Sequence, residues 1–396
     1  RYWRDWSSDV CSSDLDDFGI KYVRNEDIQH LIKIMQLKYT FKVDFDAEQY
    51  IGIHMEWNYR TRELRCSMKG YIQQALLELE HVPTDKRHVS APSIMRRPQY
   101  GAPIQYAEDD LGDPLPETQI QYLQRVVGKF LYYARAINNT MLHGLNAIAS
   151  AVTKGTTSTA AAVQCLMDYA HSNPDAEILY RASDMVLQTD SDAAYLVEPE
   201  ARSCAGGFHF LGSRDHKLFN GPIYVLAKII KSVMASAMEA EIAAMFMNAQ
   251  KIIHFCQVLT DMGHPQPPTR MRTDSKSGSG LVTGTMRQKR SKAIDMRFNW
   301  LKDRAQNHKE LDIQWAPGAG NLGDYPTKHH TGKHHLRCRP VFLNVDGKSP
   351  TTLQGCAKIL NPKSQISGTM SIEGIQKLIR RNLALLPHIL TTTVIS

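Results

Sequence analysis

Four short segments between residues 186 and 328 each carry a carboxylate in a setting that suits metal-ion chemistry: Asp190, Glu239, Asp274 and Asp324. Residues 185–190 alternate in side-chain character, which predicts a strand that ends at Asp190. A second predicted strand, 269–273, delivers Asp274 at its end. Acids at the ends of several strands and helices favour a fold that brings these ends to one place.

The segments between these acids predict further strands and helices. Strands are expected at 204–211, 223–233 and 311–315, and apolar residues at helical spacing predict a long helix from 238 to 259. Glu239 and Glu241 both flank the apolar face near the start of this helix, so periodicity does not choose between them. With a basic helical region after Asp274, the expected order is β-β-β-α-β-α-β, a mixed α/β fold.

This order, and the motifs set in it, resemble ribonuclease H, and more closely the RNase H domain of Ty1/copia-type retrotransposon Pol polyproteins. The motifs that carry the resemblance lie at 189–193, 206–212, 239–241, 273–275, 290–295 and 323–328. No single motif is specific, but their order along the chain is. The resemblance implies an RNase H-like domain over residues 183–330, with a mixed five-stranded sheet and flanking helices.

The resemblance also implies a reaction and its site. Asp190, Glu239, Asp274 and Asp324 match the four acids that hold two Mg²⁺ or Mn²⁺ ions and cleave the RNA strand of an RNA–DNA hybrid. Oxygen ligands suit these hard cations, and the cations relieve the repulsion between crowded carboxylates. Asp192 competes with Asp190 for its role, and Asp274 and Asp324 could instead cap helices.

A cluster of basic residues follows Asp274 and could bind nucleic-acid phosphates: Arg287, Lys289, Arg290 and Lys292. A solvated helix face is the alternative. The sequence departs from the family at Ala293, where many copia-type chains have a histidine, and any role of that histidine is lost.

The N-terminal part resembles the end of a reverse transcriptase. Asp16 and Asp17 precede an apolar run, as in the paired-aspartate motif of that enzyme, and residues 16–89 are expected to form a remnant of its palm and thumb. The polymerase needs a further aspartate on an earlier palm strand, so we expect a truncated, inactive reverse transcriptase. Residues 1–15 resemble the conceptual translation of a sequencing-library adapter; a disordered N-terminus is the alternative.

The remaining segments are expected to play supporting roles. Residues 90–182 are predicted to form a linker loop and a helical thumb or connection, and residues 331–396 a basic, partly disordered tail. Histidines between 329 and 338 fit no usual zinc-site spacing.

Composition is consistent with this interpretation. The net charge of +7 permits a nucleic-acid partner, and seven cysteines without a C-x-x-C pair indicate a reducing compartment. No apolar run is long enough for a membrane span. We therefore expect an intracellular protein, in a virus-like particle or the nucleus, whose partners are RNA–DNA hybrid and other Pol or Gag products, without a membrane.

Two other functions stay open. A decayed retroelement protein could bind nucleic acid without cleaving it. An integrase-like member of the same fold superfamily is also possible on fold alone. The segment that begins at Asp16 argues against the latter, because integrase precedes polymerase in copia-type elements.

Overall fold

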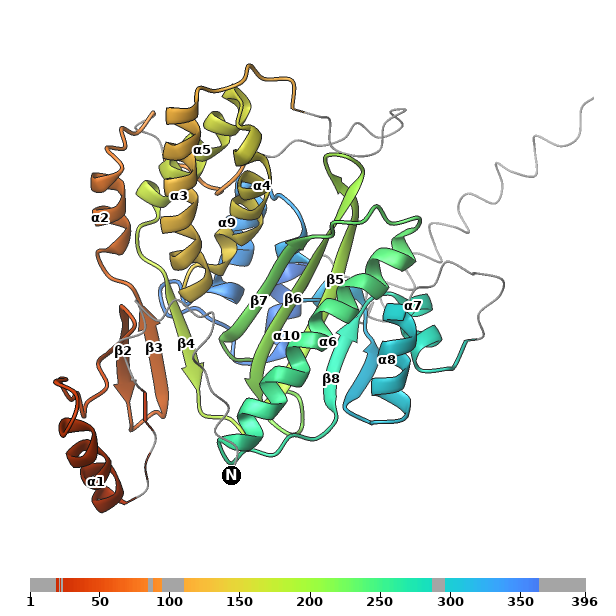
Figure 1. Cartoon of the computed structure of the whole chain (residues 1–396). Helices are drawn as coiled ribbons and strands as arrows, with labels where there is room; N and C mark the ends of the chain where they lie inside the picture. Colours follow the sequence, from red (N-terminus) through yellow and green to blue (C-terminus); the bar gives the residue numbers. More distant parts are fainter. Residues whose placement is uncertain are drawn as a thin grey trace, which may run out of the picture.

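The computed structural model describes residues 19–20, 22, 24–84, 88–94, 110–286 and 296–362, and its strands form two sheets (Figure 1). The first sheet is antiparallel, in the order β1 (Gln49–Tyr50), β2 (Ile53–Asn58), β3 (Glu63–Ser67) and β4 (Glu177–Arg181). Strands β2 and β3 form a hairpin within residues 16–89. Strand β4, which was not predicted, pairs with β3 across more than a hundred residues of chain.

Five helices belong to the first half of the chain. Helix α1 (Asn25–Gln36) precedes the first sheet, and α2 (Tyr71–Glu78) follows β3. The other three, α3 (Glu117–Ala136), α4 (Leu142–Ala151) and α5 (Thr157–Ser172), are those predicted for the thumb or connection. Their apolar faces bury Phe130, Leu145 and Tyr169 completely. Over the described ranges, no helix combines the length and the apolar character that a membrane crossing needs.

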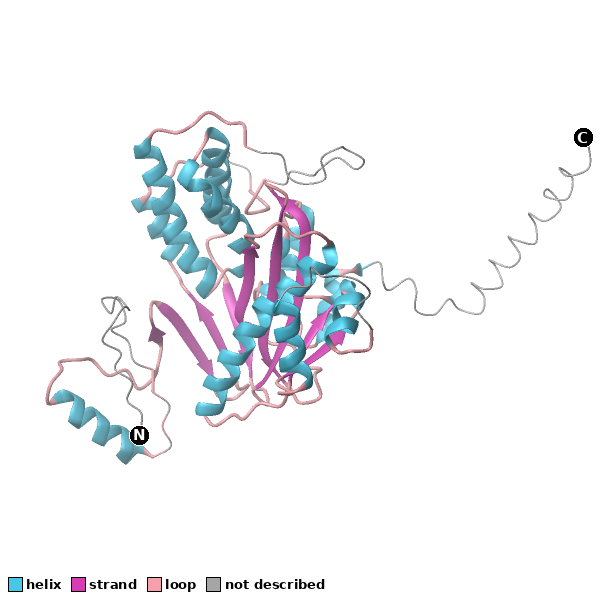
Figure 2. Ribbon diagram, turned by 45° about the vertical axis from the view of Figure 1, so that its right-hand side comes forward, coloured by secondary structure: helices cyan, strands magenta, loops and turns pink. Residues whose placement is uncertain are grey.

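The second sheet has the order β7-β6-β5-β8-β9, and it confirms the predicted mixed α/β fold class and five-stranded mixed sheet. Its first three strands are antiparallel: β5 (Val186–Glu198), β6 (Arg202–Gly212) and β7 (Pro222–Ile229). The other two, β8 (Thr269–Thr273) and β9 (Leu311–Trp315), run parallel to β5. The long helix α6 (Ala237–Asp261) connects β7 to β8 and crosses the sheet, while α7 (Lys276–Val282) and α8 (Met296–Gln306) precede β9 (Figure 2).

A buried polar network fixes α6 on the sheet. Asn248 of α6 donates to the Ser191 hydroxyl at 3.0 Å and to the Gly206 carbonyl at 2.9 Å, and its side-chain oxygen lies 2.9 Å from His209 Nε2. His209 Nδ1 in turn lies 2.9 Å from the Thr189 hydroxyl. A Cβ on Gly207 would come within 1.8 Å of the Asn248 side chain, so this close approach requires glycine.

The opposite face of the sheet is covered by the segment after β9, which corrects one prediction. Residues 331–362, predicted as part of a partly disordered tail, contain α9 (Gly332–Phe342) and α10 (Leu353–Leu360). Five basic or histidine side chains interrupt the apolar spacing of α9, but its C-terminal end is buried. There Phe342 packs against Phe208 and Tyr325 with ring centroids 5.6 and 4.5 Å apart. Residues 363–396 lie outside the described residues.

We expect Phe342→Ala to lower the free energy of unfolding by about 3–5 kcal/mol, because a buried aromatic ring is lost and a cavity remains. Leu336→Ala on the same helix is the matched control, since Leu336 is 43% exposed whereas Phe342 is 2% exposed. Urea unfolding of the full chain measures both. Equal midpoints for Phe342→Ala and the unmodified chain would contradict the packing of α9 into the core.

Candidate active site

Three carboxylates from three separate elements converge at one end of the second sheet. They belong to Asp192 on β5, Glu241 near the start of α6, and Asp274 directly after β8, and one oxygen of each lies within 4.8 Å of the others. Asp192 is buried, Glu241 half-buried and Asp274 exposed, so the cluster opens to solvent on the Asp274 side.

The strand register explains why these acids meet. Strands β5 and β8 are parallel, and Asp190 pairs with Arg272. Two residues further along each strand, Asp192 and Asp274 therefore reach the same level at the edge of the sheet. Helix α6 brings Glu241 onto this level, where its Oε1 accepts a hydrogen bond of 3.3 Å from the backbone amide of Ala193.

The electrostatics of the cluster favour neutral carboxyls unless a cation is present. Burial, and then the neighbouring Asp324, raise the pKa of Asp192 to about 7. Burial, and then Asp192, raise the pKa of Glu241 to about 9. Burial and Asp324 also raise the pKa of Asp274. The pKa values rise because like charges lie close together with little water between them, and a bound cation would lower these pKa values.

The donor set fits a hard divalent cation. The three potential ligands are all carboxylates, and Glu241 Oε2 is buried without a hydrogen-bond partner. Oxygen ligands of this kind, with room for water on the exposed side, are those that Mg²⁺ and Mn²⁺ prefer. Asp192, Glu241 and Asp274 are thus the residues that would hold such an ion.

Asp324 lies at the rim of this cluster. It is close enough to raise the pKa values of Asp192 and Asp274, but it is outside the group whose oxygens lie within 4.8 Å of one another. Its carboxylate forms an ion pair with Lys328. The Lys328 ammonium therefore supplies a positive charge beside the acids.

The structure corrects the prediction that Asp190 joins the cluster. Both oxygens of Asp190 accept from the guanidinium of Arg272 on β8, and one also accepts from the Leu322 amide at 2.9 Å. Asp190 is 1% exposed, and these bonds hold both of its oxygens. Asp190 ties β5 to β8 and to the segment after β9, and it lies outside the group of carboxylates that could share an ion.

The prediction for Glu239 is corrected as well. Ser236 caps α6 by accepting from the Glu239 amide at 3.2 Å, and the Glu239 carboxylate accepts from the Ala235 amide at 2.7 Å. These reciprocal bonds resemble a capping box, in which a serine is followed three residues later by a glutamate. The sequence contains this serine–glutamate spacing at residues 236–239. The spacing assigns Glu239 to the helix cap and so favours Glu241 as the acid that joins the cluster.

Two other sets of predicted residues lie outside the described residues. They are the paired aspartates Asp16 and Asp17, and the basic residues Arg287, Lys289, Arg290 and Lys292. Their roles stay predictions.

A curated relative supports the resemblance found in the motifs. The chain is 22% identical over 278 residues to the retrovirus-related Pol polyprotein from transposon TNT 1-94 of Nicotiana tabacum, a match that covers 68% of this chain and 20% of that protein. The chain resembles a fragment of a retrotransposon Pol polyprotein. Because it spans about a fifth of its relative's length, the activities of that whole protein do not transfer with the likeness.

The other comparisons are weaker. No family model matches the chain. LC11-RNase H1, isolated from compost by a metagenomic approach, is 14% identical with a TM-score of 0.29, over 36% of this chain and 93% of its own. A foamy viral protease-reverse transcriptase in complex with RNA/DNA hybrid is 12% identical with a TM-score of 0.33, over 50% of this chain and 25% of its own.

Gly318 offers a test of how the Asp274 carboxylate is positioned. A Cβ at residue 318 would come within 2.4 Å of Asp274 Oδ2, which is the mobile end of a side chain. We therefore expect Gly318→Ala to fold normally but to turn this carboxylate away and weaken Mn²⁺ binding by about tenfold. Titration followed by electron paramagnetic resonance measures the affinity. Gly128→Ala, where a Cβ meets no atom within 4 Å, is the control, and equal affinities for both variants would contradict the placement.

The pKa shifts predict how stability depends on pH. Without a divalent cation the folded chain retains protons on Asp192 and Glu241 that the unfolded chain releases, so stability falls as pH rises from about 5 to 9. Glu241→Gln removes one of the two titrating groups, so the variant should lose less stability as pH rises. The free energy of unfolding of the variant, relative to that of the unmodified chain, should therefore increase with pH. Denaturant unfolding at about pH 5 and pH 8 measures this difference. A difference that does not change with pH would show that Glu241 is not held in its neutral form.

Proposed function

We propose that this chain is a ribonuclease H that cleaves the RNA strand of RNA–DNA hybrids with two divalent metal ions. The observation that carries the proposal is the convergence of Asp192, Glu241 and Asp274 at the edge of a mixed sheet. The likeness to a retrotransposon Pol polyprotein supports it, because such an element copies RNA into DNA and leaves hybrids behind.

The three carboxylates have distinct tasks in this proposal. Asp192 is the most buried, and the Thr327 hydroxyl donates to its Oδ2 at 3.2 Å, so its carboxylate has a fixed orientation in which it would hold the cations. Glu241 completes the inner side, and Asp274 faces solvent, where the scissile phosphate would approach. Asp324 serves as an outer ligand.

Bound divalent cations would activate a water for attack on phosphorus and stabilise the leaving 3′ oxygen, so that the products carry a 5′-phosphate and a 3′-hydroxyl. The chain's own residues hold the carboxylates at one edge of the sheet, and the charge of the cations would favour their deprotonated form. Substrate binding is assigned to Arg287, Lys289, Arg290 and Lys292, which follow Asp274 in the chain and would contact phosphates.

The choice between neighbouring acids gives the sharpest test. Asp192→Asn and Asp274→Asn should each lower cleavage of the RNA strand by about a thousandfold, since each removes a charge that the cations need. Glu239→Gln is the matched control for Glu241→Gln: it lies two residues away on the same helix and should keep cleavage within a few-fold. A fluorescent hybrid duplex with Mg²⁺ reports cleavage, and filter binding confirms that each variant still binds it.

Full cleavage by Asp192→Asn together with loss in Glu239→Gln would contradict the assignment. Hybrid binding without cleavage by the unmodified chain would favour the decayed-element alternative. Cleavage of double-stranded DNA in preference to hybrid would favour the integrase-like one.

A further inference from the structure

A second cluster of metal-binding side chains lies apart from the three carboxylates. His143 on α4, Glu198 at the end of β5 and Cys204 on β6 each place a donor atom within 4.8 Å of the other two. All three side chains are buried. The cluster therefore joins the helical unit α3–α5 to the hairpin of β5 and β6, at the end of β5 beyond Asp192.

The contacts within this cluster leave polar atoms unsatisfied. His143 Nε2 lies 3.5 Å from Glu198 Oε1, and neither atom has a hydrogen-bond partner. His143 Nδ1 lies 3.7 Å from Cys204 Sγ. Burying such groups without partners costs free energy, and a native structure needs a reason to retain them.

We propose that His143, Glu198 and Cys204 bind a zinc-class transition-metal ion that fixes the helical unit to the sheet. The donor set is one imidazole nitrogen, one carboxylate oxygen and one thiolate sulfur, all of which Zn²⁺ accepts. The two anionic ligands also balance the charge of the ion, so the buried site becomes neutral. Sulfur and nitrogen donors bind such an ion in preference to Mg²⁺. This site therefore differs in metal preference from the oxygen-only cluster of Asp192, Glu241 and Asp274.

The spacing is close to what coordination requires. Bonds of about 2.0–2.3 Å in a tetrahedral arrangement separate neighbouring donors by roughly 3.3–3.8 Å. The distance from His143 Nε2 to Glu198 Oε1 already falls in this range. Cys204 Sγ lies 3.7 Å from His143 Nδ1, and one donor atom of each of the three residues lies within 4.8 Å of the others, so binding would draw the donors closer together.

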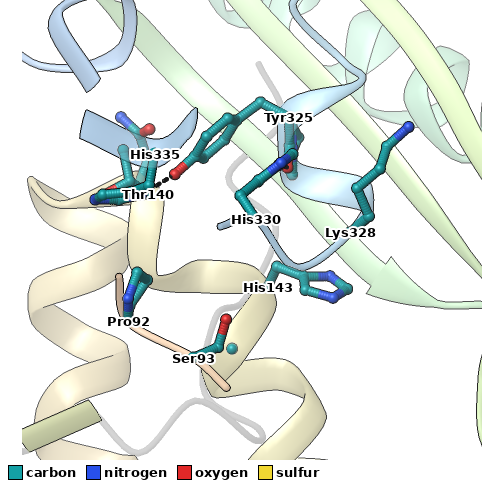
Figure 3. A pocket seen from close by; sticks show the side chains of 11 residues that line it. Pro92, Ser93, Thr140, His143, Tyr325, Lys328, His330 and His335 are labelled. Atoms are coloured by element: carbon teal, nitrogen blue, oxygen red, sulfur yellow. Dashed lines mark hydrogen bonds between the residues drawn. The ribbon is translucent and has the colours of Figure 1, made fainter. Parts of the chain in front are cut away.

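A histidine and a small cavity lie beside His143. The ring of His329 meets the ring of His143 edge-on, with centroids 4.3 Å apart, and its Nδ1 lies 2.8 Å from the Ser93 hydroxyl. A water would therefore complete the coordination. A small cavity adjoins His143, and Figure 3 shows Ser93, Tyr325, His330 and Lys328 around it.

The test is a Co²⁺ titration of the full reduced chain, followed by competition with Zn²⁺. A cysteine ligand gives a near-ultraviolet thiolate-to-cobalt charge-transfer band, which the oxygen-only cluster cannot produce. We expect one equivalent of Co²⁺ to generate this band, and one equivalent of Zn²⁺ to remove it and to raise the melting temperature. Asp274→Asn should leave the band unchanged.

Three cysteine variants locate the band. Cys204→Ser should abolish it and weaken Zn²⁺ binding by at least about a hundredfold. Cys356→Ser is the control, because Cys356 is equally buried but lies on α10. Cys338→Ser tests whether the band comes instead from Cys338 and His334, because Cys338 Sγ lies 3.3 Å from His334 Nε2.

The proposal fails if the folded, unmodified chain develops no thiolate band, an experiment that does not depend on any variant folding. It also fails if the band is lost in Cys338→Ser and kept in Cys204→Ser. Either result would leave the His143 cluster as a set of neutral hydrogen-bonding groups.

Discussion

Repulsion between like charges is the constraint on which the candidate active site depends. One carboxylate oxygen each of Asp192, Glu241 and Asp274 lies within 4.8 Å of the other two. The raised pKa values of these carboxyls reflect the cost of that crowding. A flexible scaffold would let them separate, so the surrounding structure has to hold them. Cations then stabilise an arrangement that the carboxylates alone would oppose.

The two acids excluded from the cluster provide much of this support. Asp190 binds Arg272 across two parallel strands, which sets the levels of Asp192 and Asp274 two residues further on. Glu239 completes the cap of α6, which begins the helix at the position that presents Glu241. The Asn248 network then fixes the helix on the sheet. In each neighbouring pair of acids, one residue supports the fold and the other joins the carboxylate cluster.

The sequence predicted the fold well, because strand alternation and helical spacing are local signals. It could not separate Asp190 from Asp192, since alternate residues of a strand share a face and only the partner strand decides which one meets Arg272. Strand β4 and helices α9 and α10 were missed for a related reason. They are short, with five to eleven residues each, so they carry little periodicity of their own. Their buried residues contact partners distant in sequence, as Phe342 contacts Phe208.

A crystal of the full chain grown with Mn²⁺ tests the central claim most directly, because anomalous scattering locates the ion without assumptions about activity. We predict an anomalous peak within about 2.0–2.4 Å of carboxylate oxygens of Asp192, Glu241 and Asp274, with Asp190 still paired to Arg272. A peak coordinated by Asp190 and Glu239 instead, or no peak at the edge of the sheet in a crystal saturated with Mn²⁺, would contradict the account.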